Sequence, residues 1–203
     1  MMHNIPRPQS KSQMPPDAKR VFDGVIFDVY HWPQVMYDGS VATFERLKRP
    51  DTTTIFPVLP DGRILLSKQL QPDRAHPFIH AFGGQIEDGE DVMAAAAREL
   101  REESGYAAKN WTLWKAYQPY SKIDWALYVF IAHGAEKVAD QDLDPGEKID
   151  VFTVTFDEFV HMVMDDDFAM PEIMPDLYQA LLNPAKMQAL REMFLDIELE
   201  PKE

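Results

Sequence analysis

Three glutamates, Glu99, Glu102 and Glu103, lie close together in a segment whose pattern predicts a helix. At about 100° per residue, their carboxylates occupy one stripe of that helix, roughly 100° wide. Carboxylates held so close together repel one another unless a cation lies against them, and hard divalent cations prefer oxygen ligands. The stripe therefore predicts a metal site for Mg²⁺, with Mn²⁺ as an alternative.

The helix that carries this stripe is expected over residues 91–104. Asp91 is a suitable N-cap, and Gly105 stands where a left-handed residue ends many helices. A second stripe of small and apolar side chains predicts the face that packs on the core. Its members are Met93, Ala96, Ala97, Leu100 and Ser104.

The same glutamates also fit an ordinary solvated helix face, in which Arg98 and Glu102 form an i,i+4 ion pair. The residues around the helix favour the metal site, because they extend the pattern in both directions. The spaced residues are Gly84, Glu90, Arg98, Glu99, Glu102, Glu103 and Gly105.

This spacing, over residues 84–106, resembles the Nudix box at every fixed position. Each fixed residue type makes up roughly 5–8% of ordinary proteins, so the whole spacing would occur by chance on the order of once in 10⁸ to 10⁹ start positions. The resemblance to the Nudix hydrolase superfamily implies an α/β (α+β) fold, an α/β/α sandwich with a mixed sheet. It also implies Mg²⁺-dependent hydrolysis of a diphosphate bond.

The resemblance assigns roles to the residues of the box. Glu99 and Glu103 are implied as the principal metal ligands, and Glu102 as an assisting one. Gly83 and Gly84 allow a tight turn that brings a main-chain carbonyl close to the metal. Arg98 is expected to orient a carboxylate such as that of Glu90.

Length and composition predict a single folded domain. The 203 residues, 45% of them hydrophobic, suffice for one core. We expect a mobile, proline-rich tail over residues 1–19 and one domain over residues 20–203. That domain divides into an N-terminal β-meander (20–50), a Nudix core (51–156) and C-terminal helices (157–203).

Alternating apolar runs and turn signals predict the remaining elements. A hairpin is expected over residues 52–69, because Pro60-Asp61-Gly62 separates two apolar runs. Further strands are expected over residues 111–117, 125–133 and 149–156, and helices over 157–164, 172–182 and 185–195.

Charge and cysteine content exclude several classes of protein. The 34 acidic and 20 basic side chains give a net charge of −14, which opposes binding to polymeric nucleic acid. The chain has no cysteine, so disulfides and thiolate zinc sites are excluded. No apolar run approaches the ~20 residues of a membrane span, so we expect a cytoplasmic protein that does not bind membranes.

The region before the box resembles the ADP-ribose pyrophosphatase branch of the superfamily, through residues 27–39, 43–45 and 49–51. The resemblance implies a homodimer in which this region also stacks on the base of the substrate. Trp32 and Tyr30 are the stacking candidates, and ordinary core packing is the alternative for both.

Other positions of the branch are matched only in part. Gln71 stands where an arginine is usual, and Arg74 is a substitute from the following loop. His80 replaces a usual glutamate. Glu147, in a loop after the box, matches the position of the catalytic base, with Glu102 as the alternative.

The expected substrate is a nucleoside diphosphate conjugate. ADP-ribose or a related nucleotide sugar would give AMP, or another nucleoside monophosphate, and a sugar phosphate. Two alternatives stay open at this point: a Nudix hydrolase of dinucleotides or nucleoside triphosphates, and a nucleotide-sensing Nudix module without catalysis.

Overall fold

A mixed sheet forms the centre of the molecule in a computed structural model that describes residues 5–195. The strand order is β12-β5-β4-β10-β8, and β6 pairs with β5. The strands are β4 (Thr52–Val58), β5 (Ile64–Leu70), β6 (Phe78–His80), β8 (Asn110–Tyr117), β10 (Leu127–His133) and β12 (Lys148–Val154). The two central strands, β4 and β10, are parallel and pair Thr52 with Leu127 at one end.

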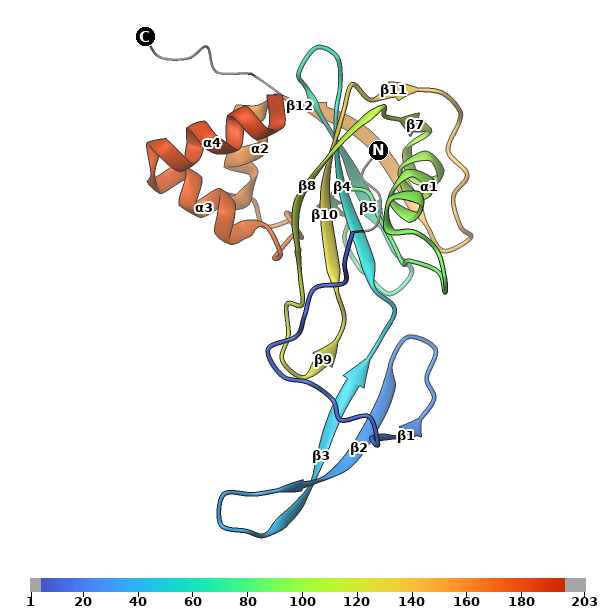
Figure 1. Cartoon of the computed structure of the whole chain (residues 1–203). Coiled ribbons are helices and arrows are strands. Elements are labelled where there is room, and N and C mark those ends of the chain that lie inside the picture. Colours follow the sequence, from blue (N-terminus) through green and yellow to red (C-terminus); the bar gives the residue numbers. More distant parts are fainter. Residues whose placement is uncertain (1–4, 196–203) are drawn as a thin grey trace.

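Helices cover both faces of this sheet, as Figure 1 shows. One face carries α1 (Val92–Ser104), and the other carries the C-terminal helices. These are α2 (Phe156–His161), the short 3₁₀ helix η1 (Met162–Met164), α3 (Met174–Leu182) and α4 (Pro184–Leu195). The predicted α/β/α sandwich with a mixed sheet is therefore confirmed. The last residues of the predicted C-terminal region, 196–203, lie outside the described residues.

A second, smaller sheet projects from the body (Figure 1). It consists of β1 (Lys19–Phe22), β2 (Asp28–Val35) and β3 (Val41–Lys48) in antiparallel order, with β9 (Ile123–Asp124) parallel to β3. The predicted N-terminal meander is thus confirmed. A two-stranded pair, β7 (Tyr106–Ala107) and β11 (Glu136–Lys137), lies near the C-terminal end of α1.

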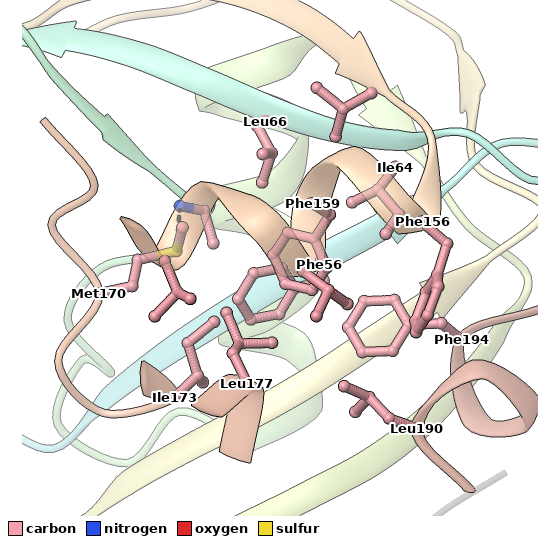
Figure 2. Close-up of a cluster of buried hydrophobic side chains, with 14 of the residues drawn as sticks. Phe56, Ile64, Leu66, Phe156, Phe159, Met170, Ile173, Leu177, Leu190 and Phe194 are labelled. Atoms are coloured by element: carbon pink, nitrogen blue, oxygen red, sulfur yellow. Dashed lines mark hydrogen bonds between the residues drawn. The ribbon is translucent and has the colours of Figure 1, made fainter. Parts of the chain in front are cut away.

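Aromatic side chains fill the core between the sheet and the C-terminal helices (Figure 2). Phe194 of α4 lies 5.2 Å from Phe159 and 5.8 Å from Phe56, between ring centroids. It also meets Phe156 and Trp114, at 5.8 and 5.4 Å. Such close ring pairs hold the C-terminal helices against the strands that carry the site.

The helix α1 forms as the sequence predicts. The Asp91 side chain accepts hydrogen bonds from the backbone of Met93 and Ala94, and Gly105 ends the helix with φ of 77°. One residue of the predicted core-facing stripe is wrong: Ala97 is exposed, and Ala95 is buried instead. The buried face therefore extends toward the carboxylate stripe, since Ala95 lies between Glu99 and Glu102 around the helix.

Residues 5–18 belong to the segment for which the sequence predicts a mobile tail, and that mobility stays a prediction. They contain no helix or strand, yet they lie against the body through polar contacts. Arg7 binds Asp51 and Asp124, and the Ser12 hydroxyl donates to the Ser121 carbonyl at 2.9 Å. Residues 1–4 lie outside the described residues. Within residues 5–195, no helix is both long and apolar enough to cross a membrane.

Candidate active site

A cavity of about 710 Å³ opens at the end of the central sheet. Its walls come from the first residues of β4, the last residues of β5, β6, α1 and the loop before β12. Glu99 and Glu103 of α1 lie on one side, and Gln71 and Arg74 lie after β5. Residues far apart in the sequence thus share one pocket, which is here named the catalytic pocket.

Glu103 is the most enclosed carboxylate of this pocket. Its residue is only 5% exposed, and its Oε2 accepts a hydrogen bond from the Gly83 backbone N–H at 2.7 Å. Burial raises the pKa of Glu103 well above its usual range, and the negative charges of Glu99 and Glu147 raise it further. A cation beside this group would relieve that unfavourable environment.

The two glycines before the box helix make room for these carboxylates. Gly83 has φ of 140°, and a Cβ there would lie 2.1 Å from the Thr53 carbonyl oxygen. A Cβ on Gly84 would lie 2.6 Å from both oxygens of the Glu99 carboxylate. Glycine is required at Gly83 because the backbone of β4 approaches so closely, while the lack of a side chain at Gly84 leaves the space that the Glu99 carboxylate occupies.

Arg98 joins the loop before α1 to the carboxylate stripe. It forms a two-pronged ion pair with Glu90, at 2.9 and 3.0 Å, and donates to Glu99 at 2.8 Å and Glu102 at 3.1 Å. It also donates to the carbonyl of Gln85 at 3.0 Å. The hydrogen bonds from Arg98 lower the pKa of Glu90, while burial raises the pKa of Glu99. Arg98 therefore orients several carboxylates at once, including Glu90.

The donor set suits a hard cation. Within residues 5–195, no three histidine, aspartate or glutamate side chains form a ready-made metal-binding group. Glu99 and Glu103 nevertheless both line the catalytic pocket and offer carboxylate oxygens to a cation there. Metal binding by these residues stays a prediction.

The loop of residues 138–147 closes the other side of the carboxylates. The Asp142 N–H donates to the Glu102 carbonyl at 2.8 Å, and the Gln141 amide donates to the Glu103 carbonyl at 2.6 Å. These contacts tie the loop to the last turn of α1. Glu147, at the end of the loop, lines the catalytic pocket, whereas the Glu102 side chain lies outside it.

Candidates for phosphate contact line the same pocket as the carboxylates of α1. Gln71 and Arg74 both line it, and the Arg74 guanidinium lies 3.9 Å from the centre of the Phe78 ring. His80 also lines the pocket, with its Nδ1 2.8 Å from the Ala81 carbonyl oxygen. Gln71 stands where an arginine is usual, so the positive charge must come from another residue. Arg74, which lines the same pocket, can supply it.

The two predicted stacking residues lie outside the catalytic pocket of their own chain. Trp32, on β2, is 9% exposed and packs edge-on against Phe44, with ring centroids 5.9 Å apart. Its indole N–H donates to Gln34 at 3.2 Å. Tyr30, on the same strand, is half-buried. Within a single chain neither residue lines the catalytic pocket, and base stacking by Trp32 and Tyr30 stays a prediction.

The structure adds two pocket residues that the sequence did not indicate. The Arg49 guanidinium lies 4.8 Å from the centre of the Trp125 ring, and the Trp125 indole donates to the Thr52 hydroxyl at 2.9 Å. Burial lowers the pKa of Arg49, and its buried Nε has no hydrogen-bond partner among the described residues. No local motif links these residues, since Trp125 and Thr52 lie far apart in the sequence.

Comparison with known proteins places this geometry in a family. The model of the NUDIX domain matches residues 48–177, which is more than half of the chain. The ADP-ribose pyrophosphatase of Bacillus subtilis (strain 168) is 28% identical over 147 residues, covering 71% of this chain and 80% of that protein. The methanol dehydrogenase activator of Bacillus methanolicus is 23% identical over 151 residues, covering 73% and 81%.

A solved structure shares the fold. The crystal structure of an ADP compounds hydrolase superposes with a TM-score of 0.69 at 20% sequence identity, covering 93% of this chain and 98% of that chain. The match of the domain model, together with the box helix and its carboxylates, shows that the chain belongs to the Nudix family.

Proposed function

We propose that this Nudix hydrolase uses Mg²⁺ to split the diphosphate of a nucleoside diphosphate conjugate, ADP-ribose or a related nucleotide sugar. The products are AMP, or another nucleoside monophosphate, and a sugar phosphate. One observation carries the proposal: carboxylates of α1 and the guanidinium groups of Arg49 and Arg74 line the same catalytic pocket. The relatives named ADP-ribose pyrophosphatase support this substrate class.

Glu99 and Glu103 would hold the metal, with the Gly83 carbonyl as a further oxygen donor; Glu102 would join them once its side chain turned into the pocket. The metal would neutralise phosphate oxygens and favour ionisation of the attacking water. Mn²⁺ would serve as an alternative, because it accepts the same oxygen ligands. An acidic pocket then binds an acidic substrate, since the cation lies between them.

The remaining steps belong to side chains of this chain. Arg98 holds Glu99 in place through its 2.8 Å hydrogen bond. Glu147 accepts the proton of a water whose oxygen forms a bond to one phosphorus atom. The bond from that phosphorus to the bridging oxygen breaks, and the second phosphate leaves with that oxygen. Glu102 is the alternative base, but its side chain would first have to enter the pocket.

Gln71, Arg74 and Arg49 act on the substrate. The guanidinium groups of Arg74 and Arg49 lie against aromatic rings, at 3.9 Å from Phe78 and 4.8 Å from Trp125. Within residues 5–195, neither forms an ion pair with a carboxylate. They are therefore available to donate hydrogen bonds to phosphate oxygens.

We also propose a homodimer formed through the N-terminal sheet. This sheet exposes large apolar side chains that a single chain leaves in water. They include Val21, Phe22, Val25, Ile26, Val35, Tyr37 and Val41. A second copy on this face would allow Trp32 and Tyr30 to contact the base in the partner's pocket. Light scattering on the purified protein tests the dimer, and a monomer at all concentrations would contradict it.

The substrate proposal is tested with a panel of ADP-ribose, other nucleotide sugars, dinucleotides and nucleoside triphosphates. Each is incubated with Mg²⁺, with Mn²⁺ or with a chelator, and the products are separated by chromatography. Metal-dependent release of AMP, fastest from ADP-ribose, supports the proposal. Faster turnover of dinucleotides or triphosphates would reassign the substrate, and nucleotide binding without turnover would indicate a sensing module.

A further inference from the structure

The N-terminal segment of residues 5–14 contacts parts of the chain that lie far from it in the sequence. The buried guanidinium of Arg46, on β3, donates to the Ser12 carbonyl and to the Ser10 hydroxyl. The Gln118 amide donates to the Pro8 carbonyl at 3.1 Å. The segment thus touches the N-terminal sheet and the loop that leads to β9. Residues 5–14 form this N-terminal strap.

Arg7 forms ion pairs from the strap to the rest of the chain. Its Nε and Nη2 donate to the two carboxylate oxygens of Asp51, at 2.7 and 2.9 Å. The same Nη2 donates to Asp124 at 3.0 Å. One guanidinium therefore bridges two carboxylates that come from different segments of the chain.

These two carboxylates directly precede two residues of the catalytic pocket. Asp51 comes before Thr52, and Asp124 comes before Trp125. The Thr52 hydroxyl accepts the indole hydrogen bond of Trp125 at 2.9 Å. Asp51 also accepts a hydrogen bond from the Ala126 N–H at 2.7 Å. The position of Trp125 relative to β4 is therefore fixed from both sides.

We propose that Arg7 is a positioning residue of the catalytic pocket, which it completes by holding Asp51 and Asp124 together and so aligning Trp125 with Thr52. The inference rests on the proposed function, because Trp125 matters as a wall of the substrate site. Without Arg7, two neighbouring carboxylates would face each other with no cation between them. Their repulsion would move Trp125, together with the Arg49 guanidinium that lies on its ring.

The expected effect is local. The Arg7 side chain is 42% exposed, and those of Asp51 and Asp124 are 19% and 21% exposed. Solvent screens an ion pair of this kind, so its contribution to overall stability is small. A change in substrate binding without a large change in melting temperature is the signature of positioning.

The test uses the full chain with Arg7→Ala, the conservative variant Arg7→Lys and the control Arg20→Ala. Arg20 is also an N-terminal arginine with two aspartate partners, Asp23 and Asp28, but it lies on β1, outside the pocket. KM and kcat are measured on the best substrate of the panel, and binding of AMP is measured by titration. The Trp125 indole N–H is followed by NMR, and Trp125→Phe identifies its signal.

Arg7→Ala is expected to raise KM and the Kd for AMP by about five-fold or more, with kcat within about two-fold, because ground-state and transition-state binding are lost together. The Trp125 indole signal is expected to shift, while that of Trp111, which donates to the Ala108 carbonyl, stays. Arg7→Lys recovers part of both effects, since a lysine cannot bridge both carboxylates with the fork of an arginine. Arg20→Ala leaves both unchanged.

An unchanged indole signal and unchanged AMP binding in Arg7→Ala would overturn the inference, even if the melting temperature fell. Equal effects of Arg7→Ala and Arg20→Ala would overturn it as well, since the effect would then lack specificity. If the wild-type protein hydrolyses no member of the panel, the proposed function fails. The indole signal and AMP titration then still decide the role of Arg7.

Discussion

Gly84→Ala should separate activity from stability at the carboxylate stripe. A Cβ at this position would lie 2.6 Å from the carboxylate oxygens of Glu99. Ordinary contacts of this kind are about 3.5 Å, so the carboxylate would have to retreat by about 0.9 Å. A misplacement of about 1 Å in a catalytic group can cost about 100-fold in rate. We therefore expect kcat to fall by about that factor.

The stability of the same variant should change little. Gly84 does not have a positive φ, so alanine is compatible with its backbone, and the Glu99 side chain can move. We expect a change of about 1 kcal/mol or less in the free energy of unfolding. Gly39→Ala is the matched control, because Gly39 has φ of 84° with no atom near its Cβ and lies in the turn between β2 and β3.

The assay combines steady-state hydrolysis with urea unfolding for the wild-type protein and both variants. Gly39→Ala should lose about 1 kcal/mol through its left-handed backbone and keep its kcat. The reasoning is refuted if Gly84→Ala keeps a kcat within about three-fold of the wild type, because the Glu99 carboxylate would then tolerate the displacement.

Three further substitutions probe the substrate wall, the helix cap and the core. Arg49→Ala should raise KM about ten-fold with little change in kcat, since it removes a cation from the pocket wall; an unchanged KM would contradict this role. Asp91→Ala should lower the free energy of unfolding by about 1 kcal/mol, because two N–H groups at the start of α1 lose their acceptor. Urea unfolding measures this loss, and Asp91→Asn should retain most of the stability. Phe194→Ala should lower the free energy of unfolding by about 3–5 kcal/mol, because it removes a fully buried ring that contacts four others. A loss below about 1 kcal/mol would show that α4 does not close the core.

The box helix could be predicted from sequence because its determinants are local. Asp91 caps it, Gly105 ends it, and the glutamate spacing fixes which side chains share a face. The face that meets the core could not be fixed as closely: Ala95 and Ala97 are both alanine, yet they lie about 160° apart around the helix and only Ala95 is buried. Volume and hydrophobicity do not distinguish the two positions.

The far wall of the pocket could not be predicted, because it depends on tertiary contacts. Arg49 and Trp125 meet only after β9 has paired with β3 and β10 with β4. An arginine also fits an ordinary surface position, and a tryptophan also fits an ordinary core position. Trp32 is a different case: its substrate contact is implied by a resemblance and stays a prediction, while within one chain its ring packs against Phe44.

The contacts of the N-terminal strap were missed for a physical reason as well. Apolar content predicts whether a segment can bury surface, and residues 5–14 have little of it. Arg7 is held by ion pairs instead, whose partners lie in distant parts of the sequence. Composition alone therefore predicts a mobile tail for this proline-rich segment, although its one arginine forms ion pairs with the rest of the chain.

The central claim is that the buried carboxylates of α1 are the centre of metal-dependent diphosphate hydrolysis. Its most direct test is AMP release from ADP-ribose, with Mg²⁺ and with a chelator, by the wild-type protein, Glu103→Gln and Glu136→Gln. Glu136 is an exposed glutamate of β11, outside the catalytic pocket, and serves as the matched control. We expect turnover only with metal, a loss of about 100-fold or more in Glu103→Gln with its fold retained, and no loss in Glu136→Gln. Near-normal turnover by Glu103→Gln, or turnover in the chelator, would contradict the claim.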